Sequence, residues 1–228
     1  MTAPLLAEPL TRSVEDYLKA IYRLSQGTQP AATSEIAELL GLSPPSVSGM
    51  VRRLSEQGLL EYVPYRGVLL TASGRRVALQ MVRRHRLIEA YLVGFLGYSW
   101  DTVHDEAERL EHAVSDLLIE RMALALGHPR FDPHGDPIPS PDGSVDELVY
   151  TPLAEIPVGE AAEVRRVDTS QADRLRYLEH SGLKPGTRLT ILARQPFRGP
   201  TTLRIGGEDQ VIGHELAQQV LCVRPEPQ

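Results

Sequence analysis

Residues 33–58 decide the fold of the N-terminal part. They read Thr33-Ser-Glu-Ile-Ala-Glu-Leu-Leu40, then Gly41-Leu-Ser43, then Pro44-Pro-Ser-Val-Ser-Gly-Met-Val-Arg-Arg-Leu-Ser-Glu-Gln-Gly58. A short helix, a turn with glycine, and a second helix with serine at its cap and proline in its first turn are typical of a helix-turn-helix. The apolar residues of both helices fit one shared core, formed by Ile36, Ala37, Leu40, Leu42, Val47, Val51 and Leu54.

The flanking residues extend this motif to a winged helix. Two short β-rich runs, 59–63 and 68–71, are separated by Pro64-Tyr-Arg-Gly67, which predicts a hairpin. Before the motif, the apolar spacing of residues 14–24 predicts a further helix, with Ser13 as its cap. A helix-turn-helix followed by a hairpin is typical of a winged helix.

The winged-helix pattern predicts that the protein binds double-stranded DNA. The helix from Pro44 would enter the major groove and the arginines would contact phosphate. Gly49 lies where a base-reading side chain is expected, so DNA shape would supply part of the preference. A winged helix used only for protein contacts is the alternative. The expected DNA-binding residues are Ser43, Pro45, Ser46, Ser48, Arg52, Arg53 and Arg66.

The net charge of −6 divides unevenly along the chain. Residues 1–86 carry eleven Lys and Arg against seven Asp and Glu, whereas residues 87–151 carry three against thirteen. An acidic segment gains most from bound cations. The single cysteine, Cys222, excludes a disulfide framework, and the start of the chain, with Glu8 and Pro9, is not typical of a secretory signal. We therefore expect a cytoplasmic protein with no membrane partner.

The acidic segment contains closely spaced imidazoles and carboxylates. Apolar residues recur at helical intervals through 101–126, which predicts one amphipathic helix. His104, Glu108, Glu111 and His112 would share a face of it. Crowded carboxylates repel one another unless a divalent cation binds, and imidazole nitrogen completes such a shell. A solvated acidic face paired with Arg109 is the alternative reading.

A second pair with the same spacing occurs earlier. The periodicity from Ser73 to Leu96 predicts a long helix on which His85 and Glu89 are one turn apart. The neighbouring arginines, Arg84 among them, also allow a salt-bridged face without metal.

Several motifs in order resemble one family. Arg84-His-Arg-Leu87 with Glu89, then Val103-His-Asp-Glu-Ala107, then Glu111-His112, downstream of a winged helix, resemble the metal-dependent regulators of the diphtheria-toxin-repressor and manganese-transport-regulator family. Pro133-His-Gly-Asp-Pro-Ile-Pro139 matches a further signature, with Asp132 where many members have cysteine. The resemblance implies a homodimeric, metal-activated transcriptional regulator that controls metal-ion homeostasis genes, in particular those for metal uptake.

The resemblance also implies two metal sites. The primary site falls on Asp16, Glu108, Glu111 and His112, and the second site on His85, Glu89 and His104. Iron-responsive members have Met and Cys where this chain has Asp16 and Glu108, so the carboxylates favour Mn²⁺, with Fe²⁺ as the alternative. Lys19 departs from one manganese-responsive pattern, which has a carboxylate there. A capping box with Ser13 is the alternative role for Asp16.

The C-terminal residues predict a small β domain. Residues 128–150 are rich in Pro, Gly and Asp and indicate a loop before a domain boundary. Short strand-like runs, one short helix at 172–181 and the turn Gly182-Leu-Lys-Pro-Gly186 resemble an SH3-like, FeoA-type barrel. In iron-type relatives this domain offers extra ligands, and Asp173 is the candidate here. A domain that only packs or contacts protein is the alternative.

The expected architecture is mainly α with small β parts, in three domains. These are a winged helix-turn-helix at 1–74, a helical dimerisation and metal-binding domain at 75–150, and an SH3-like domain at 151–228. We expect a regulator with no organic substrate rather than an enzyme. A regulator that senses a small organic ligand and a metal-dependent hydrolase are the rivals, but the polar His/Glu clustering and the lack of a separate nucleophile oppose them.

Overall fold

The computed structural model describes residues 11–25, 29–145 and 148–224. Glu8 and Pro9 lie outside the described residues. The chain forms two compact units, Met1–Arg84 with Pro139–Ser144, and His85–Ile138 with Val145–Gln228. Within the described ranges, no helix is both long enough and apolar enough to cross a membrane.

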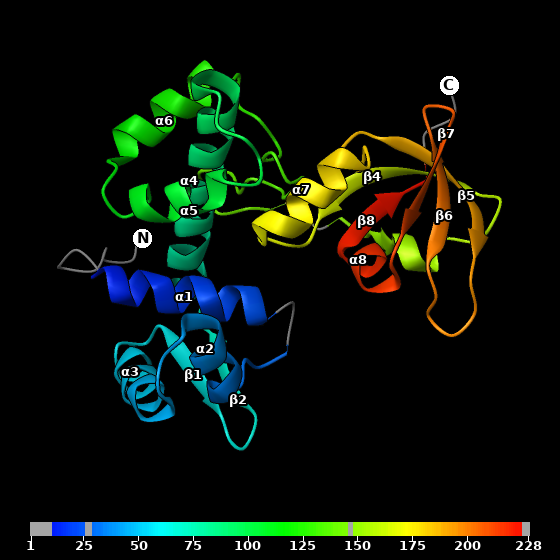
Figure 1. Ribbon diagram of the computed structural model, residues 1–228. Coiled ribbons are helices and arrows are strands. Elements are labelled where there is room, and N and C mark those ends of the chain that lie inside the picture. Colours follow the sequence, from blue (N-terminus) through cyan, green and yellow to red (C-terminus); the bar gives the residue numbers. More distant parts are fainter. Residues whose placement is uncertain (1–10, 26–28, 146–147, 225–228) are drawn as a thin grey trace. The chain divides into compact units, whose positions relative to one another are not determined.

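The first unit contains the winged helix (Figure 1). Helices α1 (Arg12–Leu24), α2 (Thr33–Leu40) and α3 (Pro44–Glu56) precede an antiparallel hairpin of β1 (Leu60–Val63) and β2 (Gly67–Leu70). Gly41 ends α2 in the left-handed conformation, with φ 64°. The predicted helix-turn-helix and hairpin are confirmed. Of the residues predicted for the core, Ile36, Ala37, Val47, Val51 and Leu54 are buried in one cluster and Leu40 packs against it. Leu42 is 42% exposed and lies outside this cluster, so its prediction as a core residue is wrong.

The start of α1 corrects one prediction. Thr11, not Ser13, occupies the N-cap position, and it makes no side-chain cap hydrogen bond. Ser13 therefore lies within the helix, and Asp16 is too far along it for a capping box. Asp16 instead forms an ion pair with Arg12, with 3.9 Å between Oδ2 and Nε.

Helix α4 (Ala72–Leu96) has the length expected from the sequence. Its residues up to Arg84 belong to the first unit, and those from His85 onward belong to the second. In the second unit, Leu87, Ile88 and Leu92 form a core with residues of the next two helices. This packing presents the His85–Glu89 face of α4 to the acidic segment.

The acidic segment is two helices, so the prediction of one helix through 101–126 is wrong. Helix α5 spans Val103–Leu110 and α6 spans Asp116–Ala125. The chain turns between them because Ser115 caps α6, its hydroxyl accepting a hydrogen bond from the Leu118 N–H at 3.3 Å. Glu111 and His112 therefore lie in the turn that follows α5.

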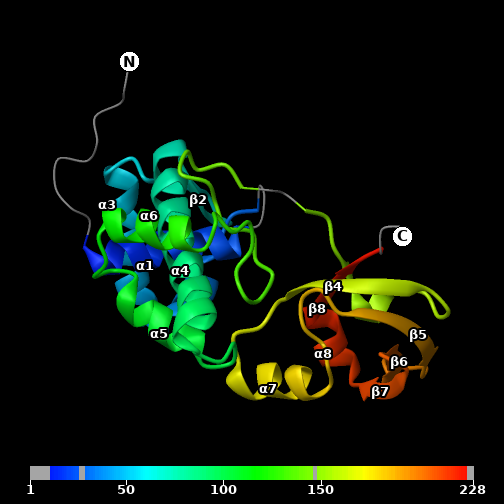
Figure 2. The same cartoon turned by 90° about the horizontal axis from the view of Figure 1, so that it is seen from above.

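The C-terminal part is a six-stranded sheet with neighbour order β3-β8-β4-β5-β6-β7. Its strands are antiparallel and comprise β3 (Thr151–Pro152), β4 (Ala161–Val167), β5 (Arg188–Arg194), β6 (Thr201–Ile205), β7 (Glu208–Ile212) and β8 (Val220–Val223). The short 3-10 helix η1 (Leu153–Glu155) and helices α7 (Ala172–His180) and α8 (His214–Gln219) accompany it (Figure 2). The sequence patterns did not predict β3, β7 or α8. The antiparallel sheet is compatible with an SH3-like domain.

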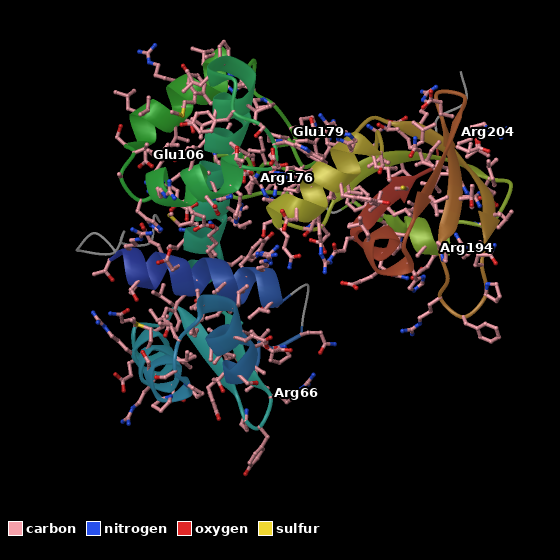
Figure 3. All side chains as sticks on the ribbon, viewed as in Figure 1. Arg66, Glu106, Arg176, Glu179, Arg194 and Arg204 are labelled. Atoms are coloured by element: carbon pink, nitrogen blue, oxygen red, sulfur yellow. The ribbon has the colours of Figure 1, made fainter. Side chains whose placement is uncertain are left out.

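Trp100, in the connection from α4 to α5, is buried in the core of this C-terminal sheet. Asp101 beside it pairs with Arg176 of α7 at 3.1 Å, and only 7% of the Asp101 side chain is exposed. Figure 3 labels Arg176 on α7. The helical part and the sheet of the second unit therefore share packed residues.

Candidate functional site

The first donor cluster joins α4 and α5. His85, His104 and Glu108 offer ligand atoms that all lie within 4.8 Å of one another. His85 Nε2 lies 3.1 Å from His104 Nδ1, and Glu108 Oε1 lies 3.7 Å from His104 Nε2. His85 is buried, whereas His104 and Glu108 are partly exposed, so the cluster has a side open to solvent.

Glu89 is the centre of the buried polar network. Its Oε1 lies 2.9 Å from His85 Nε2 and 3.0 Å from His104 Nδ1, and its Oε2 lies 3.6 Å from His134 Nδ1. Burial raises the pKa of Glu89, but the charge of His85 and hydrogen bonds from His104, His134 and His85 outweigh that effect and hold it well below its usual range. The carboxylate is therefore ionised and surrounded by imidazoles.

A second donor cluster consists of Glu89, Asp132 and His134, all buried, with ligand atoms also within 4.8 Å of one another. Burial raises the pKa of Asp132 to about 7, helped by Asp136 and Glu89. Burial lowers the pKa of His134, but a hydrogen bond to Glu89 and the charges of Glu89 and Asp132 raise it to about 9. Glu89 thus belongs to this second cluster and also contacts His85 and His104 of the first.

Asp132 and His134 of this second cluster lie in a loop for which the sequence predicted no ligands. Asp132 Oδ1 accepts from the backbone N–H groups of His134 at 2.8 Å and Asp136 at 2.9 Å, which fixes a tight turn. His134 Nε2 lies 2.7 Å from the Trp100 carbonyl oxygen. The available signal was a carboxylate and an imidazole two residues apart in one loop, with Pro133 between them and Gly135 after them.

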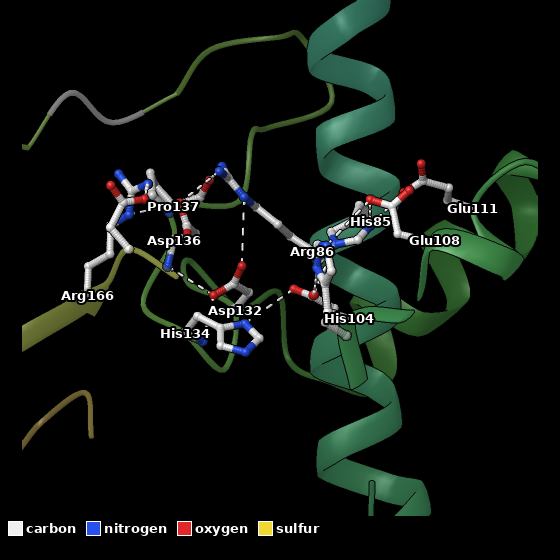
Figure 4. A network of polar contacts seen from close by, with 12 residues as sticks. His85, Arg86, His104, Glu108, Glu111, Asp132, His134, Asp136, Pro137 and Arg166 are labelled. Carbon is white, nitrogen blue, oxygen red and sulfur yellow. Dashed lines mark hydrogen bonds and ion pairs between the residues drawn. The ribbon is translucent and has the colours of Figure 1, made fainter. Parts of the chain in front are cut away.

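Contacts with the C-terminal sheet hold this loop in place. The His134 carbonyl accepts a hydrogen bond from the Val167 N–H of β4 at 2.9 Å. Asp136 pairs with Arg86 of α4 at 2.9 Å and with Arg166 of β4 at 3.1 Å. Figure 4 shows Asp136 between these two arginines. The loop is therefore bonded to α4 and β4 together.

Glu111 and His112 lie next to the first cluster. Glu111 is fully buried, and its Oε2 lies 2.6 Å from His85 Nδ1. Its other oxygen, Oε1, lies 3.4 Å from His112 Nε2. His85 thus has a carboxylate at each ring nitrogen, and a ligand bond at either nitrogen would replace one of these contacts. The second unit brings together His85, Glu89, His104, Glu108, Glu111 and His112, all predicted from the sequence.

Two further predicted ligands lie on other helices. Asp16 is half-buried on α1 in the first unit. Asp173, on α7, is 93% exposed, forms an ion pair with Arg176 and belongs to neither donor cluster.

The predicted DNA-binding residues are all exposed on the winged helix. Ser43 is the N-cap residue of α3, and the Ser48 hydroxyl donates to the Pro44 carbonyl at 3.0 Å. Arg52 pairs with Glu56 at 3.1 Å across one turn, with 83% of the Arg52 side chain exposed. Pro45, Ser46, Arg53 and Arg66 complete this surface.

The donor set fits a divalent cation. Each cluster combines carboxylate oxygen with imidazole nitrogen, and the buried carboxylates Glu89 and Asp132 lie close enough to repel one another when ionised. Cysteine sulfur is absent from both clusters within the described residues. A hard or borderline divalent ion suits these ligands better than a soft one. The fold and the site together define a metal-dependent DNA-binding regulator.

Comparison with known proteins agrees with this class. Residues 9–68 match the N-terminal DNA-binding domain of iron-dependent repressors, residues 71–140 match their metal-binding and dimerisation domain, and residues 151–224 match the FeoA domain. The iron-dependent repressor IdeR of Mycobacterium tuberculosis is 34% identical over 223 residues, covering 92% of this chain and 96% of its own. The diphtheria toxin repressor of Corynebacterium glutamicum is 31% identical over 233 residues, covering 95% and 98%.

Solved structures give the same result. A manganese-dependent transcriptional repressor in complex with manganese is 42% identical, with a TM-score of 0.86, covering 93% of this chain and all of its own. The manganese regulator SloR is 36% identical, with a TM-score of 0.75, covering 93% and 98%. The chain therefore belongs to the iron-dependent repressor family of metal-dependent transcriptional regulators. Its relatives are repressors, so the prediction that it is not an enzyme is confirmed, and the family resemblance seen in the sequence is confirmed with it.

Proposed function

We propose that this chain is a manganese-activated repressor that binds operator DNA as a homodimer, with Fe²⁺ as the alternative metal. The observation that carries the proposal is the buried Glu89 carboxylate, which contacts His85 and His104 on one side and His134 on the other. Oxygen and imidazole donors without sulfur favour manganese on softness. The relatives named above include both iron-dependent and manganese-dependent repressors.

We assign the metal-binding role in two parts. Following the family resemblance, His85, Glu89 and His104 form one proposed site, and Glu108 lies in the same donor cluster as His85 and His104. Following the family resemblance, Glu108, Glu111 and His112 form the primary site together with Asp16. Asp132 and His134 are added as ligands because they form a buried cluster with Glu89. Asp173 is kept only as a weak candidate, since its carboxylate pairs with Arg176.

Metal dependence follows from the charges on these residues. When bound, a divalent ion supplies the positive charge that the crowded carboxylates lack. With their charge neutralised, Glu89, Glu111 and Asp132 hold α4, α5 and the loop at 131–138 in one arrangement. A coupling of about 1.4 to 3 kcal/mol between metal and DNA binding corresponds to a 10- to 100-fold change in DNA affinity.

A homodimer is supported by apolar residues on the helical part. Phe95 on α4 is 55% exposed, and Leu117 and Leu124 on α6 are 68% and 58% exposed. Several large apolar side chains exposed on neighbouring helices indicate a surface that another protein covers. Two winged helices at a fixed separation would match the half-sites of a pseudo-palindromic operator.

The remaining assignments follow from the family. We propose domains at 1–74, 75–150 and 151–228, with barrel-like curvature in the last, supported by the ranges of the three family models. Ser43, Pro45, Ser46 and Ser48 face the major groove, and Arg52, Arg53 and Arg66 contact phosphate. The controlled genes serve metal homeostasis, in particular metal uptake. Because its partner is DNA, we place the protein in the cytoplasm.

The test is fluorescence-anisotropy binding to DNA from the region upstream of the protein's own gene. Mn²⁺, Fe²⁺, Zn²⁺ and chelator are compared at fixed salt. We expect tightening with Mn²⁺ that chelator reverses, and its loss in Glu108→Ala and His112→Ala. Metal-stimulated binding that survives in both variants would contradict the site assignment, and equal binding with and without every metal would contradict the function.

A further inference from the structure

The tip of the β1–β2 hairpin holds a tyrosine in a backbone conformation that favours glycine. The Val63 carbonyl accepts a hydrogen bond from the Arg66 N–H at 3.1 Å, which closes a turn with Pro64 and Tyr65 at its centre. Tyr65 has φ 63°. Proline suits the first central position of such a turn. The second central position, where φ is positive, is usually occupied by glycine or asparagine, because a larger side chain crowds the backbone there.

Burial does not compensate for this strain. Tyr65 has a relative exposure of 103%, and Tyr62 on β1 is 61% exposed. An aromatic ring in water gains nothing from the hydrophobic effect, so the folded chain alone gives no reason for tyrosine at this position. Residues held in unfavourable backbone conformations concentrate at functional sites, which makes the tip a candidate contact surface.

The hairpin is firmly attached to the helix-turn-helix. Ala31 and Val68 exchange two backbone hydrogen bonds, of 2.9 and 3.0 Å. Gly67 allows this approach, because a Cβ there would lie 2.0 Å from the Ala31 carbonyl oxygen. The Arg66 guanidinium donates to the Gln29 side chain at 3.2 Å. The direction of the tip, where Figure 3 labels Arg66, is therefore set by the fold.

The partner that suits this tip is duplex DNA. The exposed start of α3 carries only small side chains, among them Ser46, Ser48 and Gly49, so α3 offers few long donors to the base edges. An aromatic ring can pack against the sugars of DNA, and a guanidinium beside it is attracted by the negative potential of a minor groove. We propose that Tyr65 packs its ring against the sugars of the minor groove beside the site of α3, while Arg66 contacts phosphate. This inference rests on the proposed DNA-binding function.

The test compares Tyr65→Gly with wild type, using Mn²⁺ and the same upstream DNA. Loss of an aromatic contact to nucleic acid should weaken binding about tenfold. The slope of log affinity against log salt should stay unchanged, because tyrosine carries no charge. The melting temperature should not fall, because glycine accepts the positive φ without strain. Lost affinity together with kept stability is the expected result.

Phe197→Gly is the matched control. Phe197 lies in the β5–β6 turn of the other unit, has φ 58° and is 99% exposed. The same relief of strain there should leave DNA affinity unchanged. Equal loss in both variants, or a lower melting temperature for Tyr65→Gly, would overturn the assignment of Tyr65.

The outcomes also separate this inference from the proposed function. If wild type binds with Mn²⁺ and Tyr65→Gly binds equally well, the inference alone fails. If wild type shows no metal-dependent binding, the proposed function fails, and the inference fails with it.

Discussion

Gly135 lies directly against the carbonyl group of Arg165, since a Cβ on Gly135 would be 1.8 Å from that oxygen. Gly135 also has φ 87°, in the left-handed region. This contact joins the loop of Asp132 and His134 to strand β4. The glycine is needed there for the close approach of two backbones as well as for its conformational freedom.

Gly135→Ala should therefore displace the loop from β4. Gly127→Ala is the matched control, because Gly127 has φ 72° but nothing within 4 Å of its Cβ position. Both variants incur the left-handed penalty of about 1–2 kcal/mol, and Gly135→Ala should lose at least about 2 kcal/mol more from its steric overlap. Chemical denaturation without metal measures the difference. Equal stability in the two variants would show that β4 does not constrain the loop.

Glu89→Gln should impair both stability and metal binding. The variant leaves His85, His104 and His134 without the carboxylate that they contact, and breaking a buried charge pair costs about 3–5 kcal/mol. Metal affinity should fall more than about tenfold, because even outer-shell changes have effects of that size. Calorimetric titration with Mn²⁺ measures it. Glu106→Gln on α5, whose carboxylate pairs with Arg109, is the control and should bind as wild type.

Glu108→Cys should shift metal preference toward softer ions. A thiolate in place of a carboxylate favours Zn²⁺ over Mn²⁺. We expect the ratio of Zn²⁺ to Mn²⁺ affinity to rise by about tenfold or more, since a ligand change should exceed outer-shell effects. Competition titrations give this ratio. Glu106→Cys places a thiol on the same helix outside both clusters, and a similar rise there would argue against Glu108 as a ligand.

Arg52→Ala should weaken binding to all DNA sequences by a similar factor. The slope of log affinity against log salt should become less steep by about 0.9, the value for one phosphate contact. Anisotropy at several salt concentrations measures it. Arg204→Ala removes an arginine that pairs with Asp209 in the C-terminal sheet, so it should leave the slope unchanged. An unchanged slope for Arg52→Ala would remove this residue from the DNA surface.

Cys222 should make stability fall in alkaline solution. Burial raises the pKa of its thiol from 9.0 to about 12, so the folded state keeps a proton that the unfolded state releases earlier. Its contribution is fully present below pH 9 and is lost as pH rises toward about 12. Urea denaturation across this range should show a shallower decline for Cys222→Ala. Identical slopes would mean that the thiol does not titrate differently on unfolding.

The winged helix could be predicted because its signals are local. Gly41 after α2 and the prolines at the start of α3 mark the helix ends, and the apolar spacing between them fixes the buried face. The spacing of His85 and Glu89 on one long helix was likewise sufficient to pair them. These features depend on residues a few positions apart, which a sequence displays directly.

The rest depends on distant contacts. The pairing of Asp132 and His134 with Glu89 is produced by a loop whose path is set by Arg86, Trp100 and β4, and no periodicity reports such a path. Strand β7 is a polar edge strand with only one buried residue, so its pattern is weak. The two-glycine turn before it, Gly206-Gly207, was the available hairpin signal.

Trp100 gives the chain a further property. Its indole is buried in the same core as sheet residues such as Val164 and Leu203, although it precedes that sheet by some fifty residues in the sequence. The boundary of the FeoA module at 151 therefore does not coincide with the boundary of its hydrophobic core. A gene fusion that exchanged this module between relatives at that boundary would separate the core from its tryptophan. An exchange that keeps this hydrophobic core complete must therefore include the α4–α5 connection, which carries Trp100.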